Sequence, residues 1–393
     1  MSKLTAITGN EAIAQAMRQI NPEVVAAFPI TPSTQIVENF AQFVADGIVK
    51  TELVTVESEH SAMSACIGAS AAGGRVMTAT ASNGMALMWE MLYIAASLRL
   101  PILLSLVNRT LSGPINIHAD HSDSMGARDS GWIQIYTENN QEAYDAMLMA
   151  PRIAEHADVR LPVMVCFDGF IISHCVQTME LEDDEQVRKF IGEYTPLYPL
   201  LDTSRPVTMG ALDLQDYYIE HKHSQHVAMV KAKDVILSVS KEFKEAFGRG
   251  YELFESYRLE DAENVIVAIN SVAGEIKEAV DNLRKRGIKA GLLKIRFFRP
   301  FPYEEIRDAL KSAGVVAVLD RMNSFGARGP LFTEVCTALY GLESGPLAYN
   351  RLYGLGGRDM YVEDIEKIFI ESEECLKAGR TEKVFDIIGV RGA

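Results

Sequence analysis

Apolar and polar residues along the first two-fifths of the chain form blocks that predict short strands separated by helices. Strand candidates occupy residues 24–29, 52–59, 75–80, 101–107 and 162–167. Stretches with helical character lie between them, at residues 32–40, 60–74, 85–98 and 141–158. A strand that is regularly followed by a helix predicts a mostly parallel, doubly wound sheet.

The pattern changes over residues 175 to about 255, where acidic turns and prolines replace the alternation. We expect a connecting arm here, followed by a long helix over roughly residues 214–247. His221, His223 and His226 lie in the polar part of this helix. Because no cysteine or acidic ligand cluster accompanies them, they are predicted to be exposed to solvent rather than to bind a metal.

A second series of strands and helices begins near residue 264. It predicts strands at 265–270, 289–296 and 315–320, and helices at 271–286 and 303–312. A chain of 393 residues also exceeds one typical hydrophobic core. The expected fold is therefore α/β, with two doubly wound parallel-sheet domains: residues 1–255, which include the connecting arm, and residues 256–393.

The charge balance limits the partners that the chain can bind. A net charge of −15 disfavours nucleic acid, because binding phosphates requires a basic face. It also disfavours docking of an acidic small protein unless a basic partner chain supplies the surface. No apolar run is long enough to span a bilayer and no signal peptide is visible, so we expect a cytoplasmic protein without membrane contact.

Neither the cysteines nor the glycine-rich segments have the spacing of a ligand-binding motif. The cysteines form no Cys-x-x-Cys pair, which predicts reduced, mostly buried thiols and no zinc ribbon or iron–sulfur cluster on this chain. The segments at 325–330 and 353–359 match neither a Walker A nor a dinucleotide fingerprint, so turns or interface loops are expected there. The cysteines are Cys66, Cys166, Cys175, Cys336 and Cys375.

Glu59 lies between an apolar strand and an alanine-rich helix, and the next strand leads into Asn83 and Gly84. A carboxylate at the carboxyl end of a strand lies where α/β folds place their ligands. A glutamate at a helix start also complements the helix dipole, and residues 59–62 alone favour that structural role. The complete unit of strand, glutamate, small-residue helix, strand and Asn-Gly favours a ligand site.

Thr31 and Arg109 also follow predicted strands. Pro29 and Pro32 fix the backbone on both sides of Thr31, and a rigid loop that displays one hydroxyl suits contact with a substrate. Thr31 fits a helix N-cap as well, and the two roles are compatible. Arg109 can bind a carboxylate through two hydrogen bonds, although a structural salt bridge explains it equally well.

Two histidines and two aspartates fall within six residues, His118 to Asp123. Such a loop can either ligate a metal or hydrogen-bond within itself. The pattern favours the polar loop, because a His-x-x-His with neighbouring aspartates is a weak metal signature on its own.

Several motifs together resemble the alpha chains of multi-subunit 2-oxoacid:ferredoxin oxidoreductases, in particular those of pyruvate:ferredoxin oxidoreductase. The first domain is similar to the pyrimidine-binding domain of thiamine diphosphate enzymes, and the second to the C-terminal domain of transketolase. The resemblance covers essentially the whole chain. The motifs lie at residues 28–34, 57–60, 81–84, 107–109, 120–123, 129–134, 293–302, 329–334 and 353–359.

The resemblance implies a role for each candidate residue. Glu59 would hydrogen-bond N1′ of the cofactor's aminopyrimidine and start catalysis, with Pro29 and Asn83 beside the cofactor. Thr31 and Arg109 would contact the carboxylate of the 2-oxoacid. The implied reaction converts pyruvate and coenzyme A reversibly to acetyl-CoA and CO₂. A branched-chain 2-oxoacid or 2-oxoglutarate, a non-catalytic assembly chain, and an unrelated α/β protein that binds a small acid are the alternatives.

The sequence lacks the Gly-Asp-Gly segment and the downstream asparagine that bind metal and diphosphate in thiamine enzymes. The nearest match, Phe167-Asp168-Gly169, has no leading glycine. The resemblance therefore implies half of a thiamine diphosphate site, completed by a beta chain that carries the diphosphate and Mg²⁺. It also implies gamma and delta chains, with [4Fe-4S] clusters on partner chains and ferredoxin receiving the electrons.

Overall fold

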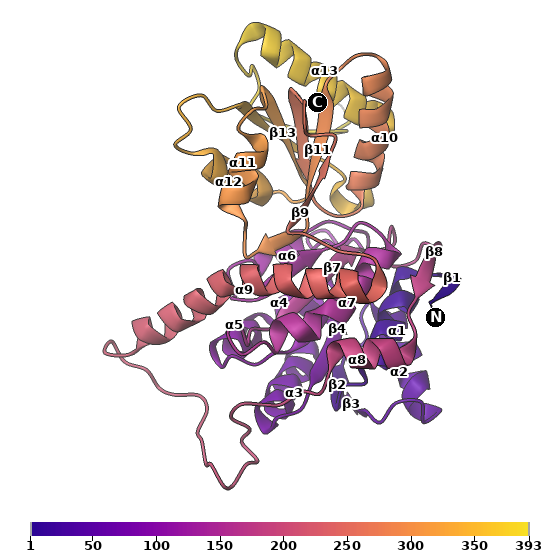
Figure 1. The fold of residues 1–393 in the computed structure, drawn as a ribbon, viewed down its shortest axis with the longest axis vertical. Coiled ribbons are helices and arrows are strands. Elements are labelled where there is room, and N and C mark those ends of the chain that lie inside the picture. Colours follow the sequence, from indigo (N-terminus) through magenta and orange to yellow (C-terminus); the bar gives the residue numbers. More distant parts are fainter. Residues whose placement is uncertain (1, 392–393) are drawn as a thin grey trace.

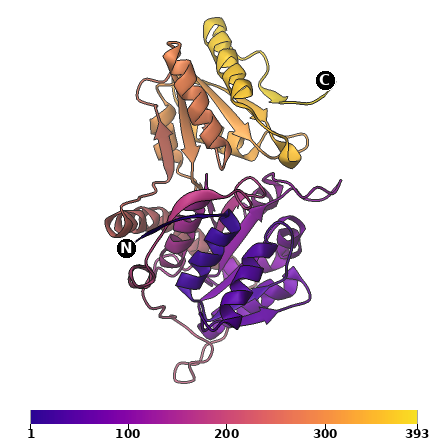
Figure 2. The ribbon, with the colours of Figure 1, turned by 90° about the vertical axis from the view of Figure 1, so that its right-hand side faces the viewer.

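The computed structural model describes residues 2–391, which form two α/β units that lie one above the other along the long axis (Figures 1 and 2). The first unit contains a seven-stranded sheet in the order β12-β6-β7-β5-β4-β2-β3. All its pairs are parallel except β12 with β6. Its strands are β2 (Val24–Ala27), β3 (Glu52–Thr55), β4 (Val76–Thr80), β5 (Leu103–Asn108), β6 (Ile133–Tyr136), β7 (Val163–Asp168) and β12 (Phe297–Arg299).

Alternation of side chains along the strands builds a core on each face of this sheet. Leu103 and Val107 of β5 enter the core on one face, whereas Leu104 and Leu106 enter the core on the other. Side chains two residues apart on a strand share a face, which explains this division. On the first face lie α1 (Gly9–Ile20), α2 (Thr34–Ala45) and α7 (Asn140–Ala154); on the second lie α3 (Glu59–Ala72), α4 (Ser82–Leu87) and α5 (Trp89–Ser97).

The second unit contains a six-stranded sheet in the order β15-β14-β13-β10-β11-β9, in which only β9 is antiparallel. Helices α10 and α13 cover one face, and α11 and α12 cover the other. The elements are β9 (Phe254–Tyr257), β10 (Asn264–Ala268), α10 (Val272–Lys285), β11 (Ala290–Ile295), α11 (Tyr303–Leu310), β13 (Val315–Asp320), α12 (Pro330–Leu339), β14 (Leu347–Leu352), η1 (Leu355–Gly357), α13 (Val362–Ala378) and β15 (Phe385–Ile387).

The expected α/β fold with two parallel sheets is confirmed. The division after residue 255 stays a prediction, since it falls inside β9, and β12 from the second half of the chain joins the first sheet. A separate two-stranded antiparallel sheet completes the first unit: β1 (Lys3–Ile7) pairs with β8 (Gln177–Leu181), and α8 (Asp184–Ile191) follows β8. No helix within residues 2–391 is long and apolar enough to cross a membrane.

Three local expectations were wrong at their boundaries. The helix predicted at 85–98 is two helices, α4 and α5, because the backbone breaks at Met88 while the apolar pattern continues through it. Helix α2 begins at Thr34 with Ser33 in the N-cap position, so Thr31 is not an N-cap and lies in the preceding turn. The strand at 52–59 ends at Thr55, which leaves Glu59 as the first residue of α3.

The long helix of the arm is α9 (Tyr218–Phe247), which begins a turn later than expected. His221, His223 and His226 are exposed on it, as predicted. The cysteines are free thiols: Cys66, Cys166 and Cys375 are buried, Cys336 is half-buried and Cys175 is exposed.

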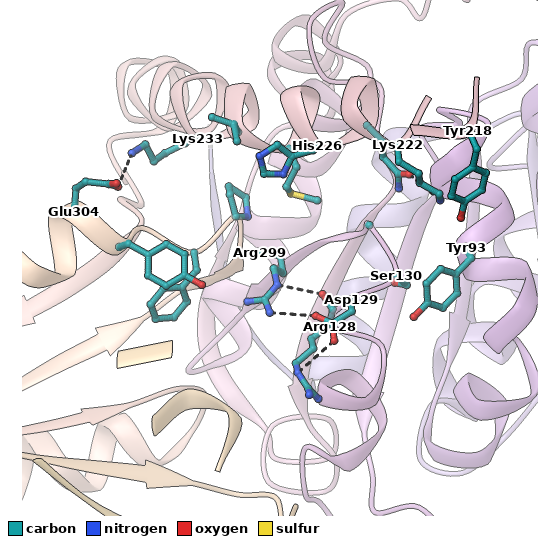
Figure 3. A pocket seen from close by; sticks show the side chains of 17 residues that line it. Tyr93, Arg128, Asp129, Ser130, Tyr218, Lys222, His226, Lys233, Arg299 and Glu304 are labelled. Carbon is teal, nitrogen blue, oxygen red and sulfur yellow. Dashed lines mark hydrogen bonds and ion pairs between the residues drawn. The ribbon is translucent and has the colours of Figure 1, made fainter. Parts of the chain in front are cut away.

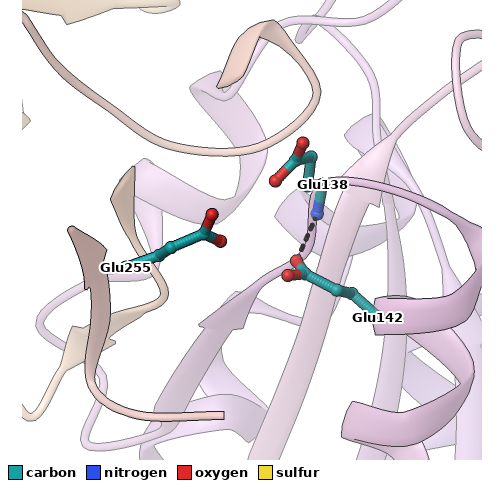
Figure 4. Close-up of side chains that lie close together, drawn as sticks. All are labelled: Glu138, Glu142 and Glu255. Carbon is teal, nitrogen blue, oxygen red and sulfur yellow. Dashed lines mark hydrogen bonds between the residues drawn. The ribbon is translucent and has the colours of Figure 1, made fainter. Parts of the chain in front are cut away.

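An ion network joins the two units, and Figure 4 shows its three carboxylates. Glu138 and Glu142 come from the first unit and Glu255 from β9, and they form the only group of three potential metal ligands among residues 2–391. Lys294 of β11 already occupies their centre, with its Nζ atom 2.6 Å, 2.7 Å and 2.7 Å from the three carboxylates. Lys277 and Arg296 supply two further cations, so three positive charges balance three negative ones.

Replacing Lys294 by methionine is expected to lower the free energy of unfolding by about 3–5 kcal/mol, because it leaves buried carboxylates without their central partner. Urea denaturation of the purified chain measures this. Lys311→Met is the matched control, because its side chain is 58% exposed and its loss is expected to change stability by less than about 0.5 kcal/mol. Equal effects of the two substitutions would show that the network contributes nothing to the junction.

The same network makes the stability of the folded protein depend on pH. Burial alone would raise the pKa of Glu142, but the charges of Arg296 and Lys294 outweigh it and lower the pKa to about 2. A carboxyl group whose pKa falls on folding stabilises the folded state above its unfolded pKa near 4.5. This contribution is lost as the pH falls from there toward 2.

Candidate active site

The predicted site residues lie at one edge of the first sheet. Thr31, Glu59, Asn83 and Arg109 follow β2, β3, β4 and β5, which are adjacent strands in the sheet. Because these strands are parallel, their carboxyl ends meet at the same edge, where open α/β sheets bind ligands.

Glu59 packs against Gly84, at a position where any other residue would place its β-carbon too close to the carboxylate. It is 6% exposed and begins α3, whose N-cap Ser58 accepts a hydrogen bond from the Ser61 backbone N–H at 3.2 Å. A β-carbon at Gly84 would lie 2.8 Å from Glu59 Oε1 and 2.3 Å from Thr80 Oγ1. The glycine of the Asn-Gly pair therefore lets the backbone of α4 approach the carboxylate.

The Glu59 carboxylate lacks a protein donor. Within residues 2–391 no group donates a hydrogen bond to it, and the buried Thr80 Oγ1 beside Gly84 also has no partner. Buried polar groups are nearly always hydrogen-bonded, so an unpaired buried hydroxyl beside a carboxylate that has no protein donor favours an external ligand. A helix-dipole role alone does not account for a carboxylate buried next to a second unpaired oxygen.

Arg109 joins the β5 edge to the turn that contains Thr31. Its Nη1 atom donates to the Thr31 carbonyl at 2.8 Å, and its Nε atom donates to the Asn116 carbonyl at 3.1 Å. No carboxylate of residues 2–391 pairs with the guanidinium, so the explanation of Arg109 as a structural salt bridge is wrong. Burial lowers its pKa, and the charge of Asp123 partly offsets this. A buried guanidinium without an anionic partner suits a substrate carboxylate.

Asp123 holds the backbone around the site, a role that no pattern within its loop predicts. Its carboxylate accepts hydrogen bonds from the backbone N–H groups of Ser82, Arg109 and Ser124, at 3.0, 3.0 and 2.7 Å. It also accepts one from Asn108 Nδ2 at 2.9 Å. Burial raises its pKa to about 6, against the effect of these donors. The carboxylate thus links the ends of β4 and β5, which carry Asn83 and Arg109.

Asn83 is exposed and fastens the loop that follows Arg109. Its Nδ2 atom donates to Ser112 Oγ at 2.7 Å, and its Oδ1 atom accepts from the Ser112 backbone N–H at 3.2 Å. Pro29 is exposed in the turn before Thr31. The structure therefore places both at the rim of the site, while Glu59 and Arg109 are buried in it.

The loop His118–Asp123 lies at the interface between the two units, where the His121 backbone N–H donates to the Arg321 carbonyl at 2.9 Å. Asp120 Oδ1 accepts hydrogen bonds from the Ser122 backbone N–H and hydroxyl, which confirms bonding within the loop. His121, however, contacts Asp168 of β7, its Nε2 lying 3.0 Å from Oδ1. The glycine-rich segment at 353–359, where turns or interface loops were expected, packs here, since the Gly357 backbone N–H donates to the Ala119 carbonyl at 2.9 Å.

Comparisons with known proteins identify relatives that cover both units of the chain. Residues 15–241 match the family described as pyruvate flavodoxin/ferredoxin oxidoreductase, thiamine diphosphate-binding, and residues 262–365 match core domain II of pyruvate:ferredoxin oxidoreductase. The chain is 60% identical to pyruvate synthase subunit PorA of Thermotoga maritima, over 93% of each chain. It is 45% identical to ketoisovalerate oxidoreductase subunit VorA of Pyrococcus horikoshii, over 96% of this chain and 95% of the relative.

Solved structures share the fold. The 2-oxoglutarate:ferredoxin oxidoreductase of Magnetococcus marinus has a TM-score of 0.72 at 21% identity, covering 94% of this chain and 65% of that one. A split-gene transketolase has a TM-score of 0.56 at 13% identity, covering 94% of this chain and 98% of that one. The fold is thus that of the thiamine diphosphate-dependent 2-oxoacid oxidoreductases, with the expected transketolase-like second domain. The chain belongs to the pyruvate:ferredoxin oxidoreductase family, and its role is that of an alpha subunit in a 2-oxoacid:ferredoxin oxidoreductase.

Proposed function

We propose that this chain is the alpha subunit of a pyruvate:ferredoxin oxidoreductase that forms acetyl-CoA and CO₂ from pyruvate and coenzyme A. The relatives at 60%, 48% and 46% identity are pyruvate synthase subunits, which supports pyruvate as the substrate, and ketoisovalerate subunits follow at 45%. The single observation that carries a catalytic role is the buried Glu59 carboxylate without a protein donor. A purely structural assembly chain has no need for it.

Glu59 fits the aminopyrimidine of thiamine diphosphate. The carboxylate is an acceptor next to a glycine-lined gap, and N1′ of the aminopyrimidine is the atom with which it would share a proton. When bound, the cofactor supplies the carbon nucleophile and the electron sink for loss of CO₂ from a 2-oxoacid. Pro29 and Asn83, at the rim, would line the entrance to the cofactor.

Arg109 and Thr31 would orient the substrate. The guanidinium keeps Nη2 free of a protein carboxylate and offsets the charge of an incoming 2-oxoacid. Its bond to the Thr31 carbonyl fixes the turn that presents the Thr31 hydroxyl. Asp123 holds the backbone of Arg109 and thus the position from which its side chain extends.

The cofactor site requires a second protein chain. Large apolar side chains are exposed beside the site, and a surface of this kind is typical of an interface. We assign this face to a beta chain, which would hold the diphosphate and Mg²⁺. Gamma and delta chains with [4Fe-4S] clusters would pass the electrons to ferredoxin. The exposed side chains are Leu87 (52%), Trp89 (42%), Ile115 (78%) and Ile117 (40%).

The proposed function is tested on the native complex, purified without oxygen through a tag on this chain. Coenzyme A-dependent reduction of viologen is measured with pyruvate, 2-oxoisovalerate and 2-oxoglutarate at equal concentrations. The highest kcat/KM is expected with pyruvate. A preference for another 2-oxoacid would overturn the substrate assignment, and the absence of activity with all three would overturn the catalytic one.

A further inference from the structure

A side chain of the first unit occupies the crevice where the second sheet would bind a ligand. Strand β10 lies between β11 and β13, and α10 and α12 cover opposite faces, so the carboxyl ends of β10 and β13 form a topological switch point. Asp168, the last residue of β7, fills this crevice. Its buried carboxylate lies 3.2 Å from Arg321 Nη1 and accepts a hydrogen bond from the Ser271 backbone N–H at 3.2 Å. The ligand-binding edges of the two sheets therefore face each other.

Asn270 of the second unit lies among residues of the first unit at this junction. It is 1% exposed, and its φ of 63° lies in the left-handed region, which asparagine tolerates better than most residues. Its Oδ1 atom accepts a hydrogen bond from the Thr137 backbone N–H at 3.0 Å, which fixes the orientation of the amide. Its Nδ2 atom therefore faces Asn108, the last residue of β5, and donates to Asn108 Oδ1 at 3.2 Å.

This contact determines the orientation of the Asn108 amide. Asn108 Nδ2 donates to Asp123 Oδ1 and to Ser124 Oγ, each at 2.9 Å, and within residues 2–391 no group other than Asn270 donates to Asn108 Oδ1. The two ends of an amide have the same shape and differ in donor and acceptor character, so rotation of Asn108 would turn an oxygen toward the Asp123 carboxylate. The donor from Asn270 opposes that rotation and thereby secures the bond between Asn108 and Asp123.

Asp123 extends the chain of contacts to the proposed substrate site. Its Oδ2 atom accepts the Arg109 backbone N–H at 3.0 Å, and the Arg109 guanidinium reaches from there to the Thr31 carbonyl at 2.8 Å. We propose that Asn270 is a positioning residue for Arg109, so that the second unit helps to place the substrate carboxylate. It acts through Asn108 and Asp123, without direct contact with the substrate. This inference rests on the substrate role proposed above for Arg109.

Asn270→Gly in the assembled complex tests the proposal, because glycine adopts the same φ without strain and only the side chain is lost. The kcat/KM for pyruvate is expected to fall about 10–100-fold, since misplacement of a binding group by about 1 Å has effects of up to this size. The content of thiamine diphosphate should stay unchanged. Asn270→Ser is the second variant in case the glycine variant does not assemble, because its shorter side chain cannot bond to both Thr137 and Asn108.

A double-mutant cycle with Arg109→Ala separates positioning from a general loss of structure. Because Asn270 acts through Arg109, adding Asn270→Gly to Arg109→Ala is expected to change kcat/KM by less than about two-fold. An undiminished effect in the Arg109→Ala background, or full kcat/KM in the folded Asn270→Gly complex, would refute the positioning role. An unchanged kcat/KM in Arg109→Ala alone would instead overturn the substrate role on which the inference rests.

The matched control loosens the junction at a different place. Arg299 of β12 lines a cleft of about 740 Å³ beneath α9, where Figure 3 shows its ion pair with Asp129, and its Nη2 atom donates to Glu334 of α12 at 2.7 Å. Glu334→Ala removes this contact between the first sheet and the second unit. Thermal unfolding should show that Glu334→Ala and Asn270→Gly are folded and less stable than wild type, while kcat/KM falls only in Asn270→Gly. An equal fall in both would show that any loosening of the junction lowers activity, against a specific role of Asn270.

Discussion

Glu59→Gln is expected to leave the complex assembled and to lower its turnover by about 10²–10⁴-fold. The substitution preserves shape, which matters because Glu59 Oε1 lies against Gly84 in a closely packed space. It removes the group that can share a proton with N1′ of the cofactor, and an amide cannot replace it. The measurement is kcat of the purified complex at saturating pyruvate, with the content of thiamine diphosphate determined in parallel.

Glu57→Gln is the matched control for this substitution. Glu57 lies two residues earlier, is exposed, and accepts a hydrogen bond from Ser61 Oγ at 2.7 Å. Its replacement is expected to leave kcat within about two-fold of wild type, as surface substitutions are usually nearly neutral. If Glu59→Gln also retained nearly full turnover, Glu59 would be only a carboxylate at a helix start.

Arg109→Ala is expected to lower kcat/KM for pyruvate by a factor that corresponds to about 2–5 kcal/mol, with the content of thiamine diphosphate unchanged. The guanidinium is buried and has no carboxylate partner among residues 2–391, so its removal leaves the substrate carboxylate without a counter-charge. Thr31→Val should act in the same direction with a smaller effect, because it removes one uncharged hydroxyl.

The test of Arg109 requires its own controls. Arg380→Ala removes an arginine that is 75% exposed and is expected to leave kcat/KM unchanged. Thermal unfolding should show that Arg109→Ala is folded, since the substitution also removes bonds to Thr31 and Asn116. Loss of bound cofactor with an unchanged affinity for pyruvate would show that Arg109 serves the cofactor instead.

The local hydrophobic pattern predicted the site residues that lie at the carboxyl ends of strands. Apolar runs identify parallel strands, and parallel strands place their carboxyl ends together, so Thr31, Glu59, Asn83 and Arg109 were expected at one edge. The motifs added the chemistry of the thiamine diphosphate enzymes. Neither the hydrophobic pattern nor the motifs predict the hydrogen-bond partners of the site side chains, because these partners are distant in sequence.

The features that the sequence did not reveal are long-range contacts. Asp123 bonds to Ser82, 41 residues away, and Lys294 bonds to Glu138, 156 residues away. Strand β12 pairs with β6 although its neighbours in the chain belong to the second sheet. Hydrophobic periodicity records which face of an element is buried, and it carries no information about which partner covers that face.

The shared cofactor site is the central claim, and equilibrium dialysis tests it most directly. Labelled thiamine diphosphate with Mg²⁺ is dialysed against this chain alone, the beta chain alone, and an equimolar mixture. Stable binding is expected only in the mixture, because this chain would supply Glu59 for the aminopyrimidine and lacks a diphosphate-binding Gly-Asp-Gly segment. The Glu59→Gln chain in the mixture should bind more weakly. Tight binding to this chain alone would contradict the shared site.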